Sequence, residues 1–412
     1  MRVLLVTHHF WPENFKVNDL IDGLLDKGHD VTILTGKPNY PEGKIYPEFR
    51  DNPQKFRKFR SAQIKRVPVI PRGSSRIQLF LNYLSFLFSL SLLGPFKTRK
   101  KKFDCILVFA VSPISVAIPA ILISKLRKVP VLLWVLDLWP ETLMALGFKS
   151  KGLLGFISHV VNFIYKQAAI ILVPSKGAVK KIKDDYNLQN NVFFFPGWAE
   201  ELFNINEAGQ PVIPLESDCF NIVFTGNIGE AQDFGSLIKV ANKCKEVKRI
   251  KWHIVGDGRK KSWLDKKILE NGLDNTIYTH GSFDVSEMPA LLANADALLL
   301  SLRNNPIFEI TIPGKFQTYC SARKPIISLA KGEVNNLVDD INAGVTGVSD
   351  NLDEFAKKII DLSKMPIDKL KDMGKNASSF AKKEFNRDHL IDRFEDCFVH
   401  HEMETVSYTH LT

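Results

Sequence analysis

Short apolar segments alternate with helical patterns along the whole chain of 412 residues. The first example joins a strand pattern at 2–7, a helical pattern at 17–27 and a strand pattern at 30–35. Strand, helix and strand within about 35 residues are typical of a βαβ unit, whose strands lie parallel in one sheet. The alternation restarts at residue 220. The sequence therefore predicts an α/β fold with two doubly wound parallel-sheet domains.

The boundaries of these domains follow from where the alternation fades. A weakly patterned stretch with Gly209 and Pro211 indicates an interdomain linker. A last helical pattern, with Leu390, Ile391 and Phe394 at helical spacing, comes near the end of the chain. The residues after it show no periodicity, and we assign them no structure. The predicted segments are an N-terminal domain 1–198, a linker 199–218, a C-terminal domain 219–383, a C-terminal helix 384–399 and a tail 400–412.

Charge is distributed unevenly along the chain. The net charge is +10, yet residues 1–198 carry +16 and the remainder carries −6. A basic half is attracted to an acidic surface, either nucleic acid or an anionic membrane leaflet. The five cysteines are scattered without paired spacing, which predicts reduced thiols and neither a disulfide framework nor a zinc site. Residues 2–7 are too few for the apolar core of a secretory signal.

One segment, 77–96, is apolar almost all round. Arg72 and Arg76 precede it and the basic run 97–102 follows it. A spanning helix needs roughly 20 apolar residues, so this one is marginal. Spanning would also place elements of one sheet on opposite sides of a membrane. We predict a helix that lies in the interface of an anionic membrane, with about 72–102 making the contact. The alternative is a buried core helix with a basic cap.

The stretch 304–325 follows an apolar strand pattern at 297–302 and leads into a helix near Lys315. The free N–H groups at a helix start form an anion site, and a cation in the first turn is unfavourable unless an anion binds there. Glu309 and Gln317 offer groups that bind sugar hydroxyls. The pattern favours a binding site for a diphosphate sugar. An ordinary β–turn–α connection with a solvated Lys315 is the alternative.

Glycine turns follow three other strand patterns of this domain, at 226–232, 256–259 and 281–283. Such turns allow the backbone to approach a phosphate or a ribose. Each turn alone is weak evidence. Three such turns at the carboxyl ends of strands in one domain are stronger evidence, because the turns would converge on a single crevice. No GxGxxG dinucleotide motif is present.

The N-terminal domain has polar groups at the ends of two predicted strands, where ligands of open α/β sheets collect. Asp137 and Glu141 follow the strand pattern at 130–136, with an aromatic between them. Two carboxylates at such a place are candidates for catalysis or hydroxyl binding. Asp137 could equally cap the following helix. The groups after the first strand are His8, His9, Glu13 and Asn14.

Several motifs together resemble the family-four glycosyltransferases of the GT-B fold. They are HFWPENF, DLWPE, TGNIGEAQDF, VGDGR and TIPGKFQTY, in this order. The bacterial group that builds O-antigen, capsule and exopolysaccharide repeats, including N-acetyl-L-fucosamine transferases, is the most similar. The resemblance implies two Rossmann-like domains facing across a cleft, with the last helix crossing back to the first domain. It also implies a nucleotide-sugar donor in the C-terminal domain and an acceptor at the N-terminal one.

The resemblance also assigns roles to single residues. It puts Gly226 and Asn227 near the donor diphosphate, Gly256 and Gly258 beside the nucleoside, and Ser282 and Phe283 at the base. Glu309 would face the donor sugar, while Lys315 and Gln317 would hold phosphate and ribose. The family's Arg and Lys after the glycine turn are missing, so Lys315 and Arg303 would supply positive charge. A histidine that commonly precedes the first-domain aspartate is Leu136 here. The candidates for catalysis remain Asp137, Glu309 and Glu13.

The expected reaction retains the anomeric configuration, and the leaving phosphate takes the acceptor proton. The sequence has no DxD motif, so we predict metal-independent catalysis without a cofactor. The predicted protein moves a sugar, such as an N-acetylated deoxyhexosamine, from a UDP-sugar to a polyprenyl-diphosphate-linked saccharide. It would act as a peripheral protein on the cytoplasmic face of the cell membrane. A UDP-sugar 2-epimerase of the same architecture is the alternative. Binding to nucleic acid is disfavoured because the basic residues are not interleaved with exposed aromatics.

Overall fold

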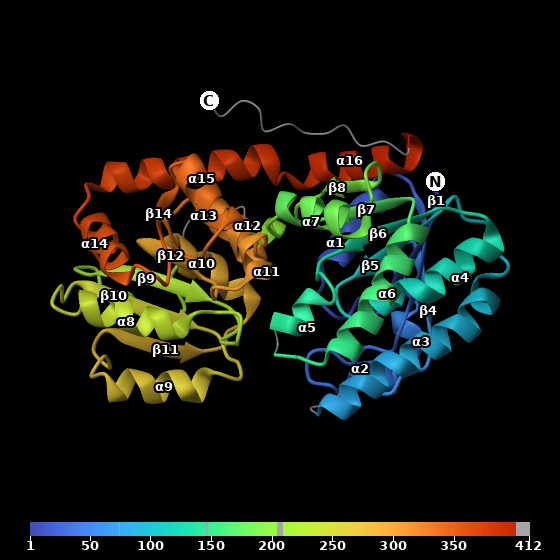
Figure 1. The fold of residues 1–412 in the computed structure, drawn as a ribbon, viewed down its shortest axis with the longest axis horizontal. Helices are drawn as coiled ribbons and strands as arrows, with labels where there is room; N and C mark the ends of the chain where they lie inside the picture. Colours follow the sequence, from blue (N-terminus) through green and yellow to red (C-terminus); the bar gives the residue numbers. More distant parts are fainter. Residues whose placement is uncertain (74, 146, 204–208, 401–412) are drawn as a thin grey trace. The chain divides into compact units, whose positions relative to one another are not determined.

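The computed structural model describes residues 1–73, 75–145, 147–203 and 209–400 (Figure 1). The chain forms two compact units. The first comprises Met1–Phe195 together with the described residues from Asp388 on, and the second comprises Pro196–Arg387. The predicted linker is therefore part of the second unit. The predicted tail lies, from residue 401 on, outside the described residues.

The first unit is built on an eight-stranded sheet in the order β3-β4-β2-β1-β5-β6-β7-β8. All neighbouring strands pair parallel except β3, which pairs antiparallel with β4. The central strands are apolar throughout because helices cover both faces of a parallel sheet. The strands are β1 (Arg2–Thr7), β2 (Asp30–Thr35), β3 (Lys58–Phe59), β4 (Ala62–Arg66), β5 (Cys105–Ala110), β6 (Val131–Val135), β7 (Ile170–Val173) and β8 (Val192–Phe194).

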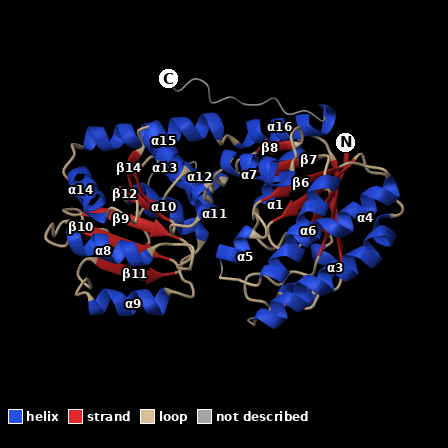
Figure 2. Ribbon diagram, viewed as in Figure 1, coloured by secondary structure: helices blue, strands red, loops and turns tan. Residues whose placement is uncertain are grey.

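Side-chain caps start some of the helices of the first unit. Ser75 and Gln78 form a capping box at the start of α3, and Ser175 accepts a hydrogen bond from Ala178 N at the start of α7. Figure 2 shows these helices around the sheet. They are α1 (Lys16–Asp26), α2 (Pro47–Asp51), α3 (Arg76–Thr98), α4 (Ala117–Arg127), α5 (Glu141–Ala145), α6 (Lys151–Gln167), α7 (Lys176–Tyr186) and α16 (Arg387–His400), with 3₁₀ turns at Pro53–Phe56 and Ile114–Val116.

The last helix, α16, packs on the first unit. Phe394 lies against Phe195, with ring centroids 5.6 Å apart. Lys27 pairs with Asp392 and with Glu395, whose carboxylate lies 3.2 Å from Lys27 Nζ. Residues from both ends of the chain therefore build this unit.

The second unit has a six-stranded parallel sheet in the order β11-β10-β9-β12-β13-β14. Its strands are β9 (Phe220–Thr225), β10 (Ile250–Val255), β11 (Ile277–Gly281), β12 (Ala297–Ser301), β13 (Ile326–Leu329) and β14 (Gly344–Gly347). Its helices are α8 (Phe234–Cys244), α9 (Lys261–Glu270), α10 (Met288–Asn294), α11 (Pro306–Glu309), α12 (Gly314–Ser321), α13 (Glu333–Asp340), α14 (Leu352–Ser363) and α15 (Ile367–Glu384), with 3₁₀ turns at Glu201–Phe203 and Val285–Glu287. Two parallel-sheet units confirm the predicted fold class.

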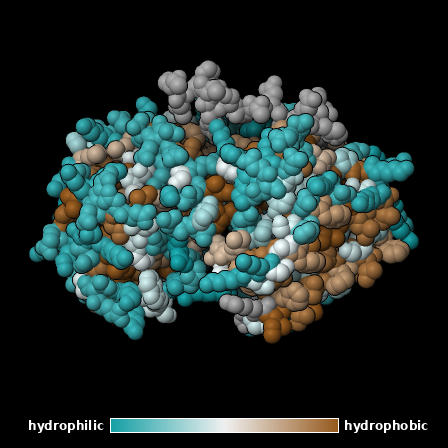
Figure 3. Space-filling model, viewed as in Figure 1, coloured by the Kyte–Doolittle hydropathy of each residue, from teal (hydrophilic) through white to brown (hydrophobic). Residues whose placement is uncertain are grey.

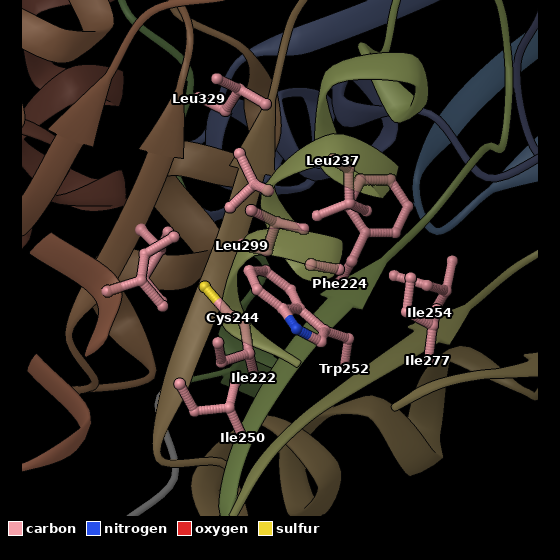
Figure 4. Packing of buried hydrophobic residues seen from close by; sticks show 14 of the residues in the cluster. Ile222, Phe224, Leu237, Cys244, Ile250, Trp252, Ile254, Ile277, Leu299 and Leu329 are labelled. Atoms are coloured by element: carbon pink, nitrogen blue, oxygen red, sulfur yellow. The ribbon is translucent and has the colours of Figure 1, made fainter. Parts of the chain in front are cut away.

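Trp252 lies at the centre of the core on one face of this sheet (Figure 4). Around it, Ile222 and Phe224 come from β9, Leu299 comes from β12, and Leu237 comes from α8. Side chains of a strand alternate between faces, so the residue after Trp252 points to the other face. That residue is His253, which is also buried.

His253 belongs to a hydrogen-bonded cluster inside the second unit. Its Nδ1 lies 3.1 Å from His280 Nε2, and its Nε2 lies 3.1 Å from Asn221 Oδ1. Tyr278 stacks on the His253 ring with centroids 5.5 Å apart. Burial, reinforced by His280, lowers the pKa of His253 to about 4. The cluster is therefore built around a neutral imidazole.

This cluster predicts a loss of stability in mild acid. The unfolded chain binds a proton at His253 near pH 6.5, whereas the folded chain resists it down to about pH 4. The free energy of unfolding should therefore fall by up to about 3 kcal/mol as pH drops through this window. We expect His253→Gln to flatten the fall, measured by urea unfolding between pH 4 and pH 7. Exposed His159 of α6 provides the control, because His159→Gln should leave the pH dependence unchanged.

Some elements at the sheet edges are not evident from the sequence. Residues 37–63 are rich in Pro and Gly, a composition typical of a loop, yet they contain α2, the 3₁₀ turn Pro53–Phe56 and β3. These elements are short, and their aromatic side chains hold them: Phe49 and Phe56 pack with ring centroids 5.7 Å apart. Strands β13 and β14 were not predicted, because runs of four residues give little periodic signal.

Helix α3 shows one buried and one exposed face. Asn82, Phe86 and Leu90 are buried, whereas Phe80, Phe88 and Leu92 are each about 60% exposed or more. Within the described residues, α3 is the one helix long and apolar enough to cross a membrane. Only 22% of its most apolar window is buried in the fold, so most of this apolar surface is exposed. The alternative of a buried core helix does not fit this exposure.

The exposed face of α3 continues onto its neighbours. Helices α3, α4 and α6 lie side by side, and hydrophobic side chains gather over them (Figure 3). We call this surface the apolar face. Its most exposed members are Ile77, Phe80, Phe88, Leu92 and Phe96 of α3, Leu122 and Leu126 of α4, and Leu153, Phe156 and Phe163 of α6.

Candidate functional site

The order of strands in the second sheet reverses between β9 and β12. In an open α/β sheet, ligands bind at the carboxyl ends of the strands at such a switch point. The turn 226–232 follows β9, and the segment 302–313, which contains α11 and leads into α12, follows β12. Tyr319 of α12 anchors this helix beside β9, because its hydroxyl accepts a hydrogen bond of 3.0 Å from Thr225 N.

The three predicted glycine turns meet at this edge. Gly226 N donates to Val255 O at 2.8 Å, and Gly256 N donates to Gly281 O at 2.7 Å. Gly256 has φ +140°, and a Cβ there would lie 1.9 Å from Gly226 O. A Cβ at Gly258 would likewise lie 2.3 Å from Ile228 O. Only glycine permits this backbone contact, so the turns form one continuous polar surface.

Lys315 crosses this surface from the first turn of α12. A Cβ at Gly226 would lie 2.7 Å from Lys315 Cε, so the absence of that Cβ makes room for the lysine. The ammonium stands 3.6 Å from the ring centroid of Phe224. Burial lowers the pKa of Lys315 to about 7. Among the described residues no carboxylate pairs with it, so an anion bound here would meet an uncompensated cation.

Glu309 is the last residue of the short helix α11, which precedes α12, and is half-buried. Its carboxylate pairs with Lys331 Nζ at 3.1 Å. Gly332, with φ +85°, lies against the Glu309 backbone, where a Cβ would be 2.1 Å from Glu309 O. The segment after β13 therefore fixes the end of α11, which carries Glu309. The sequence patterns did not identify Lys331, because they did not predict β13.

The structure contradicts the prediction for Gln317, because its side chain does not line the surface. It is 2% exposed. In the orientation that satisfies its amide, Nε2 donates to Gly314 O at 2.8 Å and to Pro313 O at 3.2 Å. Gln317 thus braces the entry to α12, and its buried amide cannot bind a ribose as predicted.

Arg303 brings a second positive charge to the surface. Its guanidinium lies 3.4 Å from a carboxylate oxygen of Glu230 in the glycine turn, and Lys260 Nζ lies 3.1 Å from the other. All three side chains are partly or largely exposed, so an anion could compete for both cations. Asn227 is exposed beside Gly258, and Phe283 is 37% exposed after β11. The predicted site residues of this unit other than Gln317 therefore lie on the turns that follow its strands, at the end of α11 or in the first turn of α12.

The first unit has its own switch point, between β1 and β5. Asp137 follows β6, the next strand, and is largely buried. Burial raises the pKa of Asp137 to about 6, and the Ser112 hydroxyl opposes this shift.

The structure also contradicts the prediction that Glu13 is a catalytic residue. Its carboxylate is 1% exposed. One oxygen accepts hydrogen bonds from Asn39 N at 2.9 Å and Tyr40 N at 2.8 Å, and lies 2.9 Å from His9 Nδ1. The other oxygen accepts from Phe10 N at 3.2 Å. A carboxylate with this many partners joins two loops and is not available to a substrate, so we do not retain it as a catalytic candidate.

The remaining acceptor-side candidates differ in exposure. His8 is buried between His9 and Phe86, with ring centroids 4.5 Å and 4.4 Å away. Burial holds the pKa of His8 well below its usual value, so the ring is neutral. Asn14 is exposed. Glu141 pairs with Lys181 Nζ of α7 at 3.0 Å.

Metal-ligating side chains do not gather at either switch point. Across the described ranges, no group of three or more His, Cys, Asp or Glu side chains could hold a metal ion.

Both units match sequence profiles of one class of enzyme. Residues 15–198 match "Glycosyl transferase 4-like domain", and residues 219–365 match "Glycosyl transferases group 1". Between them the two profiles cover most of the chain. Together with the two parallel sheets, these matches define a glycosyltransferase with the GT-B fold.

The chain belongs to the group 1 glycosyltransferases, also called family four. It is 25% identical over 335 residues to the putative colanic acid biosynthesis glycosyl transferase WcaI of Escherichia coli K12, covering 76% of this chain and 80% of that protein. Among solved structures, sucrose-phosphate synthase from Thermosynechococcus elongatus has a TM-score of 0.74 at 13% identity, covering 97% and 98% of the two chains. HepE of Anabaena, in complex with UDP-glucose, has a TM-score of 0.65 at 14% identity, covering 97% and 99%.

Proposed function

We propose that this glycosyltransferase moves a sugar from a UDP-sugar to a polyprenyl-diphosphate-linked saccharide during surface polysaccharide synthesis. The observation that carries the proposal is Lys315, a buried cation without a carboxylate partner among the described residues, placed where three glycine turns meet. Such a cation stabilises the diphosphate as it leaves. The solved structures of HepE with UDP-glucose and the relation to WcaI support the donor and the pathway class. The resemblance to N-acetyl-L-fucosamine transferases favours an N-acetylated deoxyhexosamine.

In the proposed reaction, a hydroxyl of the acceptor attacks the anomeric carbon on the face that the diphosphate leaves. The bond from that carbon to the phosphate oxygen breaks, and the phosphate oxygen takes the hydroxyl proton. Asp137 accepts a hydrogen bond from the acceptor hydroxyl, and Glu309 does so from the donor sugar. Lys315, Arg303 and the amides of the glycine turns bind the diphosphate. Configuration is retained because attack and departure share a face.

A direct assay tests the proposal. Purified protein would be given UDP-sugars in turn with a synthetic polyprenyl-diphosphate-GlcNAc acceptor, and the products separated by mass. We expect one donor to extend the lipid by one sugar. A UDP-sugar converted without any acceptor would instead indicate the 2-epimerase. Absence of transfer with every donor would overturn the proposed acceptor.

We also propose that the apolar face docks on the cytoplasmic leaflet of the membrane, where such lipid-linked acceptors reside. The carboxyl ends of α3 and α4 lie together, since Arg127 contacts Arg99 O at 3.5 Å. Exposed basic residues cluster there beside the apolar side chains, and they complement an anionic leaflet at about 1 kcal/mol each near the surface. They are Lys97, Arg99, Lys100, Lys125 and Lys128.

Vesicle flotation tests this docking. We expect the protein to float with vesicles that contain phosphatidylglycerol and much less with pure phosphatidylcholine. Raising NaCl from about 0.1 to about 0.5 M should release it, because salt screens exposed charge. The triple variant Phe80→Glu, Phe88→Glu, Leu92→Glu should lose binding at least tenfold. Ile367→Glu alters an exposed apolar side chain of the second unit, and it should bind like the parent. Equal flotation of the triple variant would overturn the assignment.

A further inference from the structure

A carboxylate stands between two cations of the polar surface that the glycine turns form. It belongs to Glu230 of the turn after β9, and one of its oxygens lies 3.1 Å from Lys260 Nζ. The other oxygen lies 3.4 Å from Arg303 Nη1. Lys260 immediately precedes α9, and Arg303 follows β12. Three segments at the carboxyl edge of the sheet therefore meet at the side chain of Glu230.

The carboxylate is not what holds these segments together. Arg303 N donates to Ala231 O at 2.9 Å, and Lys260 N donates to Ile228 O at 3.0 Å. These backbone bonds join both segments to the turn, and they remain when the carboxylate of Glu230 is removed. The influence of the carboxylate on a bound anion is therefore mainly the influence of its charge.

The charges on this surface leave a small positive excess. Lys315, Lys260 and Arg303 bring three positive charges when an anion is bound, and Glu230 brings one negative charge. The other charged side chains of the glycine turns and of the segment that carries Lys315 cancel in pairs, namely Asp257 with Arg259 and Glu309 with Lys331. Three positive charges and one negative charge leave an excess of two.

The donor and the product of a UDP-sugar transferase differ by one charge. The diphosphate of UDP-glucose is esterified at both ends and carries about two negative charges, whereas the free terminal phosphate of UDP ionises once more near about pH 6. The surface thus matches the charge of the donor but not the larger charge of UDP. Repulsion from Glu230 acts on every negative charge of a ligand, so it opposes UDP more than the donor.

We propose that Glu230 is a specificity-determining residue, which disfavours UDP relative to the UDP-sugar and so promotes release of UDP after transfer. The inference rests on the proposed function for the chemical class of the donor. Glu230 lowers the affinity for both nucleotides, and it lowers the affinity for UDP more. Weaker binding shortens the residence of UDP on the enzyme, because affinity differences within one site lie mostly in the dissociation rate.

Titration calorimetry at about pH 7.5 and about 0.1 M NaCl tests the proposal with UDP-glucose and UDP as the ligands. We expect Glu230→Gln to tighten the binding of UDP-glucose about fourfold and that of UDP about eightfold, since one exposed charge pair changes an equilibrium about twofold. At about 0.5 M NaCl both gains should shrink below about twofold, because salt screens exposed charge.

Two further variants show whether charge is the cause. Glu230→Asp keeps the charge on a shorter side chain and should bind both nucleotides within about twofold of the parent. Glu270, the last residue of α9, also lies between two lysines, with oxygens 2.7 Å from Lys267 Nζ and 3.6 Å from Lys266 Nζ. It lies about 15 Å along α9 from the carboxyl edge. Glu270→Gln should therefore leave both affinities unchanged.

The sign of the change separates repulsion from support. Weaker binding of UDP by folded Glu230→Gln would mean that the carboxylate organises the two cations for the diphosphate, and this result would overturn the inference. Equal gains for UDP and UDP-glucose, or the same gains in Glu230→Asp, would overturn it as well.

The same titrations separate this inference from the proposed function. A parent protein that binds both nucleotides, with affinities that Glu230→Gln leaves unchanged, would retain the UDP-sugar donor and reject the role of Glu230. The expected gains in a protein that transfers no sugar to the lipid-linked saccharide would retain the role of Glu230 and reject the proposed acceptor. A parent protein that binds neither nucleotide would reject the donor class and the inference with it.

Discussion

Replacement of Lys315 by methionine is expected to weaken the binding of UDP-glucose about 100-fold. Methionine keeps the apolar stem that packs over Phe224 and Gly226 but removes the ammonium. A charge-assisted bond to phosphate in a buried site contributes about 2–3 kcal/mol, which corresponds to this factor. Titration calorimetry measures the loss.

The affinity for UDP-glucose should also fall as pH rises above 7. Burial lowers the pKa of Lys315 to about 7, so the free protein loses this charge as pH rises above 7. The diphosphate of UDP-glucose favours the charged form, and its terminal phosphate is esterified, so it has no ionisation near pH 6. Affinity should therefore fall by up to about tenfold per pH unit above pH 7. Lys315→Met should remove this dependence.

Lys324 provides a matched control in the same unit. Its pKa is also lowered by burial, but it precedes β13 and so lies at the amino edge of the sheet. Lys324→Met should bind UDP-glucose within about threefold of the parent, well under the 1.4 kcal/mol of a tenfold change. Tight binding by folded Lys315→Met would remove Lys315 from the donor site.

Glu309→Gln is expected to lower kcat for transfer at least 100-fold while UDP affinity changes less than threefold. The half-buried carboxylate is held by Lys331 and by the close approach of Gly332. A fixed negative charge beside the reacting sugar stabilises positive charge that develops in the transition state, which is an effect of about 3 kcal/mol in such sites. UDP lacks the sugar, so its binding does not report on Glu309. Steady-state kinetics with saturating donor measures the loss.

A control for this variant uses an exposed carboxylate of the same unit. Asp353 of α14 pairs with Lys243, and Asp353→Asn should leave kcat unchanged. If Glu309→Gln transferred sugar at the parental rate, the carboxylate would have no part in the chemical step.

Much of the fold could be predicted because its signals are local. Apolar strands followed by amphipathic helices determine a parallel sheet, and the carboxyl ends of its strands define the ligand edge. Asp137 and Lys315 were identified in this way. Strand β13 was missed because four residues carry little periodicity, and Lys331 was missed with it.

Side-chain direction could not be predicted from the same patterns. Gln317 lies two positions after Lys315 on the same helix, but its side chain points into the core. There its amide donates to backbone carbonyls at the start of α12. Glu13 has the composition of a catalytic group, but the two loops that donate to it come together only in the fold.

The placement of α16 has a consequence for synthesis on the ribosome. All residues of the second unit leave the exit tunnel before the helix that completes the first. The second unit can fold while translation continues, whereas the first unit stays incomplete until α16 has been synthesised. The apolar face, which belongs to the first unit, is therefore completed only after the whole second unit has emerged.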